Sequence, residues 1–218
     1  MWYDGSMDAE FGQKILTIKQ WLGTGSVNIF GLPMSGKDTV GVKLAEAIGG
    51  KFLSSGLIIR ANEELTRQHY TNEGELTPSN VFYEWVLPYF DKPELKEFPL
   101  VLSSIGRWAG EEDTVMQRAQ ASGHPIKAVI ILNVSEADVM TRWQAATSLK
   151  DRGKREDDEK PEVFQKRLQE FREKTAPVLL HYKELDLLVN VNGDAERDAV
   201  FIDLVEKLYK YALSHPAN

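Results

Sequence analysis

The sequence predicts an α/β fold, a three-layer sandwich in which helices cover both faces of a parallel five-stranded sheet. Short apolar segments of strand length alternate along the chain with longer segments of helical periodicity. Several of the short segments are mainly apolar, as strands are when both faces of a parallel sheet are buried. The length of 218 residues and the apolar fraction of 42% suit one sizeable domain with an ordinary core.

A helix is predicted to precede this main fold. A helix with one apolar face is expected to pack on the domain rather than stand free. We therefore divide the chain into an N-terminal helical extension, residues 1–25, and a domain that spans residues 26–218. The apolar side chains that recur at helical spacing within residues 8–22 are Phe11, Ile15, Ile18 and Leu22.

The domain begins with the apolar segment 26–31, which ends in glycine and is predicted to be a strand. Residues 37–49 follow as a helix, because a glycine pair closes the segment as a C-terminal stop does. Residues 51–55 are predicted to be the second strand, and residues 56–68 a helix.

The middle of the domain continues this alternation. Residues 77–90 open with a Thr-Pro pair, which is a good helix start, and carry aromatic side chains on an apolar face. Residues 98–104 are typical of a buried strand. Residues 110–122 are predicted to be a helix with acids in its first turn, and residues 126–134 are the clearest strand of the sequence.

The last elements follow the same pattern. Residues 135–149 begin with a serine cap and an acid in the first turn, as a helix does. After a charged loop, residues 161–184 predict a long helix that bends near Pro177. Residues 185–193 are the fifth strand and residues 195–213 the last helix. Since ligands of such folds bind at the carboxyl ends of the strands, we expect the chemistry just after each apolar strand.

Composition and charge narrow the possible functions. The formal charge of −7 argues against a general nucleic-acid binder. The absence of cysteine excludes disulfides and thiolate zinc ligands and fits a reducing compartment. No apolar run approaches the roughly 20 residues that span a bilayer, and the acidic N-terminus does not resemble a signal peptide. We expect a cytoplasmic monomer without membrane or nucleic-acid partners.

The segment between the first strand and the next helix has the spacing of a phosphate-binding loop. Gly31, Gly36 and Lys37 form the pattern of glycine, four residues, glycine and lysine, in the strand-to-helix context that such a loop needs. Glycines let backbone N–H groups converge on phosphate oxygens, and the helix N-terminus adds partial positive charge. The lysine reaches the outer phosphates. The sequence thus predicts a site for a polyphosphate.

This loop resembles that of adenylate kinases and related nucleoside monophosphate kinases. The family reads Gly-x-Pro-Gly-x-Gly-Lys-Gly-Thr, and here the string is GLPMSGKDT. Two glycines of the family are replaced, one by Met34 and one by Asp38. The residues that match are Gly31, Pro33, Gly36, Lys37 and Thr39.

Further segments resemble the family in the same order, over about residues 26–212. The string LSSGLIIR supplies Ser55, Gly56 and Arg60. The string GELTP resembles the segment that precedes the helix of the monophosphate-binding lobe, which we place at about residues 55–90. The string LVLSSIGR keeps Arg107.

A later segment, KREDDEKPEVFQKRL, resembles an arginine-bearing region of the family, with one extra residue between Arg155 and Arg167. The charged stretch SLKDRGKREDDEK, which includes the start of this segment, corresponds to the lid of the family. It is short and free of cysteine, so we expect a small lid without structural zinc at about residues 147–160.

The resemblance implies a nucleoside monophosphate kinase, which transfers the γ-phosphoryl group of ATP to a nucleoside monophosphate with the help of Mg²⁺. Such a transfer needs positive charge and exclusion of water, and arginine binds phosphate through two parallel hydrogen bonds. By resemblance, the catalytic residues are Lys37, Arg107, Arg155 and Arg167; the ATP-binding residues are Gly31, Pro33, Ser35, Gly36, Lys37, Asp38, Thr39 and Arg142; the monophosphate-binding residues are Ser55, Gly56, Arg60, Arg107 and Glu111.

Three details stay open at this point. The family glutamine that reads adenine falls at Glu111, whose carboxylate only accepts hydrogen bonds and pairs better with the donor edge of guanine. The same acid also suits a role in stabilising the helix start. A second family arginine falls at Ala146, so either Arg152 replaces it or the contact is absent. The aromatic residues of segment 77–90 either stack on a base or belong to the core.

Asp38, directly after the lysine, is the main departure from the family. A carboxylate about 4 Å from a phosphate charge is repelled by about 4 kcal/mol at a surface-like dielectric. A divalent cation between them reverses that sign, and Mg²⁺ prefers hard oxygen ligands. Ser103 stands where the family has a strand aspartate that helps hold magnesium, so we expect Asp38 to take over part of this role. The alternatives are a weak or inactive nucleotide-binding regulator and a phosphate-loop kinase of another small metabolite.

Overall fold

The structure is a computed structural model, and it describes residues 5–68, 70, 74–149 and 160–216. Arg152, Arg155 and most of the predicted lid lie outside the described residues. Among the helices that are described, none has both the length and the apolar character that crossing a bilayer requires. The division into extension, monophosphate lobe and lid stays a prediction.

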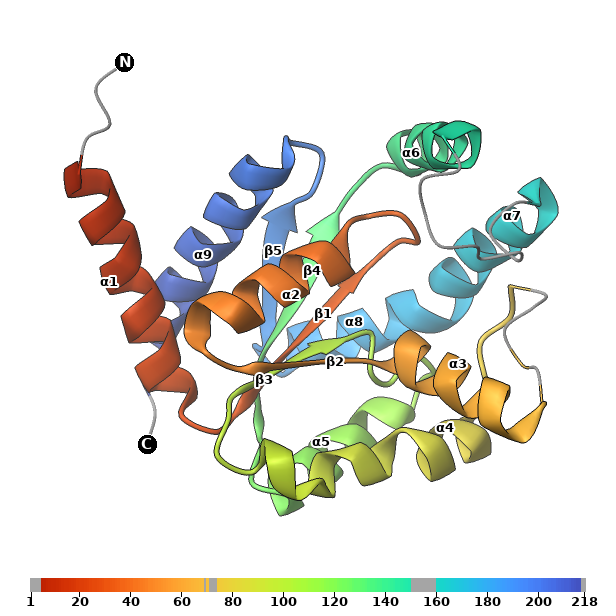
Figure 1. Cartoon of the computed structure of the whole chain (residues 1–218), viewed down its shortest axis with the longest axis horizontal. Helices are drawn as coiled ribbons and strands as arrows, with labels where there is room; N and C mark the ends of the chain where they lie inside the picture. Colours follow the sequence, from red (N-terminus) through yellow and green to blue (C-terminus); the bar gives the residue numbers. More distant parts are fainter. Residues whose placement is uncertain (1–4, 69, 71–73, 150–159, 217–218) are drawn as a thin grey trace.

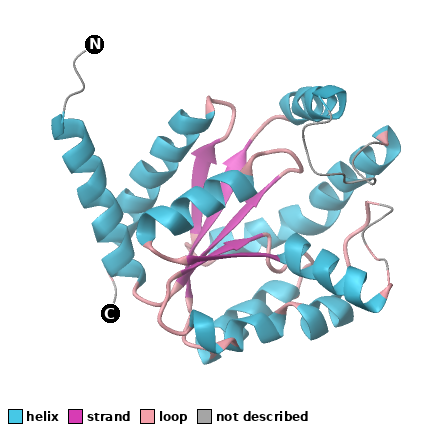
Figure 2. Cartoon of the chain, viewed as in Figure 1, coloured by secondary structure: helices cyan, strands magenta, loops and turns pink. Residues whose placement is uncertain are grey.

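Five parallel strands form one sheet in the order β2-β3-β1-β4-β5, which confirms the predicted fold class. Figure 2 shows the strands of this sheet surrounded by helices. β1 lies between β3 and β4, so the loop that follows it leaves the sheet at the middle of its carboxyl edge. β1 and β3 are buried along their whole length, including the polar residues Ser26 and Asn28 of β1 and Ser103 of β3. The strands are β1 Ser26–Gly31, β2 Lys51–Ser54, β3 Leu100–Ser103, β4 Ile126–Asn133 and β5 Leu188–Asn192.

Helices cover both faces of this sheet (Figure 1). α2 and α9 pack on one face in the largest apolar cluster, to which they contribute Leu44 and Leu204. α5 and α8 cover the other face, where Tyr182 of α8 packs against Phe30 of β1. The helices are α1 Gly5–Leu22, α2 Lys37–Ile48, α3 Ser55–Thr66, α4 Ser79–Trp85, α5 Glu111–Ala121, α6 Glu136–Leu149, α7 Pro161–Glu170, α8 Ala176–Glu184 and α9 Arg197–Ser214.

The N-terminal helix α1 packs along α9, as its apolar face predicts (Figure 1). Ile18 and Leu22 are buried in the same cluster as α2 and α9. Phe11 meets Phe201 of α9 edge to face, with ring centroids 6.0 Å apart. The Trp21 indole donates a hydrogen bond of 2.7 Å to the carbonyl oxygen of residue 215, beyond the end of α9. α1 therefore forms an outer layer of the fold on the side away from α3 and α4.

Two predicted helices differ from single regular helices, each beside a proline. The segment 77–90 is divided into α4 and a 3₁₀ turn, Leu87–Asp91, because Pro88 has no N–H to donate and disfavours helical geometry in the residue before it. The long helix predicted for 161–184 contains a π-helical turn, Phe171–Thr175, two residues before Pro177. This turn lets the chain pass the proline without its ring striking the carbonyl four residues earlier.

The aromatic residues of α4 and the following turn belong mainly to the core. Phe82 is 4% exposed and Phe90 is 1% exposed, in an apolar cluster that joins α3, α4, α5 and β3. Tyr83, Trp85 and Tyr89 are partly buried against the same cluster. Of the two alternatives for these rings, packing accounts for the group, although Phe82 also reaches the wall of the pocket described below.

Candidate functional site

The loop between β1 and α2 has the backbone conformation that its glycine spacing predicts. Gly31 ends β1, and Gly36 adopts a left-handed conformation, φ 91°, at the position that begins α2. A side chain rarely tolerates this φ, which explains the glycine. Pro33 and Ser35 are buried in the loop, and the Ser35 hydroxyl has no hydrogen-bond partner within the described part of the chain. The first turn of α2 starts at Lys37, so its backbone N–H groups point toward the space that the loop encloses.

Met34 replaces a family glycine and keeps the backbone geometry of one. Its φ is 64°, in the left-handed region that costs a side chain on the order of 1 kcal/mol. The side chain is partly buried against a cluster that includes Leu32, Val139 and Trp143. Apolar packing at the base of α6 therefore offsets the backbone strain.

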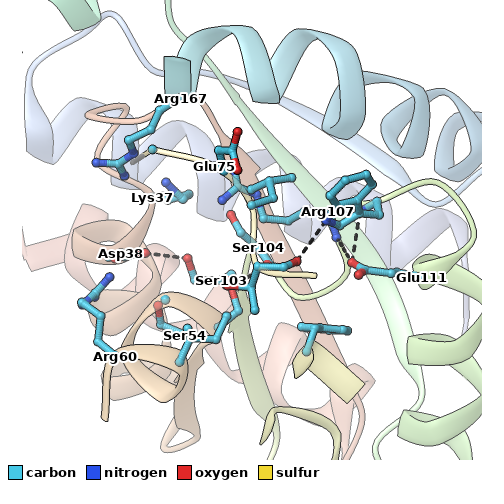
Figure 3. Close-up of a pocket in the computed structure, with 18 residues that line it drawn as sticks. Lys37, Asp38, Ser54, Arg60, Glu75, Ser103, Ser104, Arg107, Glu111 and Arg167 are labelled. Carbon is cyan, nitrogen blue, oxygen red and sulfur yellow. Dashed lines mark hydrogen bonds between the residues drawn. The ribbon is translucent and has the colours of Figure 1, made fainter. Parts of the chain in front are cut away.

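A pocket opens at the carboxyl ends of β2 and β3, beside this loop (Figure 3). Its volume is about 900 Å³, with its open mouth included. The cations come from four separate parts of the chain, namely the start of α2, α3, the segment after β3 and α7. A Cβ at Gly56 would lie 3.1 Å from Arg60 Nη1, so this glycine leaves the room that the guanidinium occupies. The charged residues of the wall are Lys37, Arg60, Arg107 and Arg167 and the acids Asp38, Glu75 and Glu111.

Buried hydrogen bonds fix the segment that carries Arg107. The Asn28 side chain of β1 donates to the Ile105 carbonyl at 2.7 Å and accepts from the Ile105 N–H at 3.2 Å. The Ser55 hydroxyl donates to the Ser104 carbonyl at 2.8 Å. Glu111 accepts from the Arg107 N–H at 2.7 Å. Anchors from β1, α3 and α5 thus hold the backbone of this arginine in place.

The environment of Arg107 is poorly suited to a positive charge unless an anion is present. Its pKa is lowered to about 10, because burial removes water from the guanidinium and Arg167 repels it. Glu111, Glu170 and Asp38 act in the opposite direction but do not cancel these effects. Arg107 Nε is buried without a hydrogen-bond partner in the described part of the chain. A bound phosphate would satisfy both the charge and the N–H group.

Asp38 and Ser103, two residues that differ from the family pattern, are in direct contact. The Ser103 hydroxyl, at the end of β3, donates a 2.5 Å hydrogen bond to Asp38 Oδ1 in the first turn of α2 (Figure 3). The Asp38 carboxylate is thereby turned toward the end of β3. In phosphate-binding loops, the hydroxyl usually stands at the end of the loop and the carboxylate on a neighbouring strand. Here the positions are exchanged: the carboxylate of Asp38 follows the loop, and the hydroxyl of Ser103 ends the strand.

A second hollow lies on the other side of the loop. It is lined by the loop itself, by α2 and α6 and by the segment before α9, and Ser35, Gly36 and Thr39 border it. Arg142 of α6 donates from Nη1 to the Ser35 carbonyl at 3.2 Å and from Nη2 to the Gly193 carbonyl at 2.8 Å. This arginine therefore ties the loop to the end of β5 at the edge of the hollow.

Most of the site residues expected from the sequence lie around these two hollows. The charged pocket is lined by Lys37, Asp38, Ser55, Gly56, Arg60, Arg107, Glu111 and Arg167, and the second hollow by Ser35, Gly36, Thr39 and Arg142. Gly31 and Pro33 form the buried part of the loop and border neither hollow. Arg155 lies outside the described residues, and its role stays a prediction.

Sequence reasoning missed the residues that join the pocket to α7. Trp108 lines the pocket and donates through its indole N–H to the Thr77 carbonyl at 3.1 Å. Lys174, in the π-helical turn, lies 3.9 Å from the centre of the same indole ring. Glu170 of α7 accepts from the Leu76 N–H at 3.1 Å. The only signal in the sequence was the position of Trp108 directly after the arginine that follows β3.

Comparisons with known proteins decide the family. No family model matches the chain. An adenylate kinase of Mycobacterium tuberculosis is 30% identical over 190 residues, which cover 84% of this chain and 99% of that protein. The chain belongs to the adenylate kinase family. Further adenylate kinases agree with this: that of Bacteroides thetaiotaomicron is 26% identical over 191 residues and that of Methanosarcina mazei 25% over 215 residues, with 98% and 100% of those proteins covered.

A solved structure has a fold similar to that of this adenylate kinase family member. A gluconokinase from Sinorhizobium meliloti superposes with a TM-score of 0.60 over 87% of this chain and 94% of that chain, at 18% identity. At this identity the likeness concerns the fold alone. The adenylate kinase relatives support the coarser statement that the protein is a kinase of the phosphate-loop class, acting on a nucleotide or another small molecule.

Proposed function

We propose that the protein transfers the γ-phosphoryl group of ATP to a nucleoside monophosphate. The observation that carries this proposal is the pocket in which Lys37, Arg60, Arg107 and Arg167 converge beside the phosphate-binding loop. Two hollows flank that loop, as two nucleotides that exchange a phosphoryl group require. The relatives named adenylate kinase support the same reaction.

The position of each residue in the site suggests its role. The loop backbone and Lys37 would hold the β- and γ-phosphates of ATP, whose base would lie in the hollow beside Arg142. Arg60 and Arg107 would bind the phosphate of the acceptor, and Arg167 would lie against the group in transfer. Phosphoryl transfer asks little covalent help of the protein, so these charges act by positioning both substrates and stabilising the spread negative charge.

Magnesium fits the residues that are present. The Asp38 carboxylate and the Ser103 hydroxyl are hard oxygen ligands, 2.5 Å apart, between the loop and the end of β3. Within the described residues no group of three or more histidines, cysteines or acids could hold a metal alone, which suits an ion that binds mainly through phosphates and water. When bound, Mg²⁺ would neutralise charge on the phosphates. Asp38 and Ser103 would hold it, and the ion would remove the repulsion between Asp38 and the nucleotide.

A test of this role is the change Asp38→Gly, which restores the glycine of the family. Without the carboxylate, the Mg²⁺ concentration that gives half-maximal rate is expected to rise by on the order of 10-fold, and the maximal rate to fall. A coupled phosphotransfer assay over a range of Mg²⁺ concentrations measures both. Ser103→Ala should act in the same direction with a smaller effect, because it removes only the hydroxyl. If Asp38→Gly is markedly faster at every Mg²⁺ concentration, the carboxylate repels the substrate and is no metal ligand.

The proposed reaction itself is tested by the same assay with a panel of acceptors. AMP, GMP, CMP and UMP are offered with ATP, and gluconate is included because a structural neighbour is a gluconokinase. Turnover of at least one monophosphate is expected, with none of gluconate. Clear ATP binding without turnover of any acceptor would identify a nucleotide-binding regulator. Turnover of gluconate alone would identify a metabolite kinase.

A further inference from the structure

Glu111 carries a buried oxygen that the fold leaves unused. The residue is 2% exposed at the start of α5. Its Oε2 accepts from the Arg107 N–H at 2.7 Å and from the Trp108 N–H at 3.0 Å. Its Oε1 is buried as well, and among the described residues it has no hydrogen-bond partner. A buried, unpaired carboxylate oxygen is costly, so a ligand that donates to it would be favoured.

The surroundings of this oxygen suit a flat ring. Glu111 lies in the wall of the charged pocket, on the side away from Lys37 and Arg167 (Figure 3). Trp108, Phe82 and Ile59 give the same pocket apolar surface. An acceptor whose phosphate lies among the arginines would therefore direct its base toward these side chains.

We propose that Glu111 Oε1 selects the base of the acceptor, and that this base is a guanine, read through its N–H groups. The inference rests on the proposed function, since it concerns the acceptor pocket of a monophosphate kinase. The two carboxylate oxygens of Glu111 have separate roles. Oε2 holds the segment that positions Arg107, and Oε1 accepts from the substrate.

The chemistry of the bases distinguishes guanine from the others. Guanine presents two adjacent donors, N1–H and the N2 amino group, to a single acceptor oxygen. Adenine and cytosine offer one amino donor beside a ring nitrogen whose lone pair would face the carboxylate. Uracil offers one N–H between two carbonyl oxygens that the carboxylate repels. Guanine gives the carboxylate two donors, whereas adenine gives it one donor and a repelled lone pair. This difference corresponds to about 10–100-fold in kcat/KM.

The hydrogen bonds to Oε2 keep the carboxylate in this orientation. The two backbone N–H groups fix one oxygen, so the other cannot rotate away to meet water. A glutamine at this position can keep the same contacts with its carbonyl oxygen, but it then presents an NH₂ donor in place of Oε1. Such a donor repels the N–H edge of guanine and pairs with N1 of adenine.

The experiment compares kcat/KM for GMP, IMP and AMP in wild type, Glu111→Gln and Glu112→Gln. Wild type is expected to prefer GMP to AMP by about 10-fold or more, with IMP between them because it lacks the N2 amino group. Glu111→Gln should shift the GMP-to-AMP ratio by about 100-fold toward AMP. Glu112 is the matched control, a neighbouring buried acid that accepts from the Gly110 N–H and does not line the pocket, so its change should leave the ratio unaltered.

The outcomes separate this inference from the function on which it rests. If wild type uses AMP as well as GMP, or if Glu111→Gln leaves the ratio unchanged, the inference is wrong while the monophosphate kinase stands. If no monophosphate is turned over, calorimetric dissociation constants for the same three nucleotides replace the rates. If none of them binds, the proposed function and the inference are both wrong. The wild-type comparison alone decides the matter should Glu111→Gln fail to fold.

Discussion

Replacing Lys37 by Met is expected to lower the maximal rate of phosphotransfer by about 10³-fold. The ammonium group lies at the start of α2, at the edge of the pocket that collects three arginines. There it can stabilise charge on the phosphates as the phosphoryl group moves, and a donor placed in this way contributes about 10²–10³ to a rate. Met keeps the length and packing of the stem but has no charge. Single-turnover measurement with saturating ATP and acceptor gives the chemical step directly.

A matched control for this change is Lys210→Met, on the exposed side of α9 and outside both hollows. It removes the same charge and should leave the rate within a factor of about 2, because exposed charges far from a site are screened by solvent and salt. A rate for Lys37→Met close to that of Lys210→Met would mean that this loop does not hold the reacting phosphates.

Arg107→Met is expected to weaken acceptor binding and, at the same time, to raise the stability of the protein. The affinity for a nucleoside monophosphate should fall by about 10²-fold, while that for ATP should stay within a factor of about 3, because Arg107 lines the acceptor side of the loop. At the same time the free energy of unfolding should rise by on the order of 1–2 kcal/mol, since the change removes a desolvated charge that Arg167 repels. Titration calorimetry and urea denaturation measure the two effects.

The control for Arg107→Met is Arg172→Met, which removes an exposed arginine that pairs with Glu136. It should alter neither affinity, and its effect on stability should be below about 1 kcal/mol. Equal loss of ATP and monophosphate affinity in Arg107→Met would show that the arginine does not belong to the acceptor. A marked loss of stability would show that its charge is satisfied within the protein.

Much of the fold was predictable because its signals are local. The glycine spacing that ends with Lys37 predicts a turn between strand and helix, and the structure has that turn, with Gly36 in the required left-handed conformation. Pro177 predicted an irregularity in the helix, and a π-helical turn lies just before it. Pro88 is an equally local signal, and the helix expected over residues 77–90 is divided there. The strand segment 126–134 was clear because it contains the uninterrupted apolar run 128–132.

The candidate site was predictable as a set of residues but not as a set of contacts. The sequence suggested that Asp38 compensates for the missing strand acid, and only the structure places its carboxylate against Ser103, 65 positions away. The approach of Lys174 to Trp108 depends on the course of the chain through the π-helical turn, which no local pattern specifies. The sequence offered two alternative roles for Glu111. In the structure one oxygen accepts from the N–H groups of Arg107 and Trp108, just before α5, and the other has no hydrogen-bond partner in the described part of the chain.

The central claim is that one cationic pocket beside Lys37 gathers the phosphates of two nucleotides. A bisubstrate analogue, in which two nucleosides are joined through five phosphates, tests it most directly by titration calorimetry. We predict one analogue bound per chain, more tightly than either substrate alone, with both ATP and the monophosphate excluded once it is bound. If the analogue gives no heat, or if the monophosphate still binds with unchanged affinity to the saturated protein, the claim is contradicted.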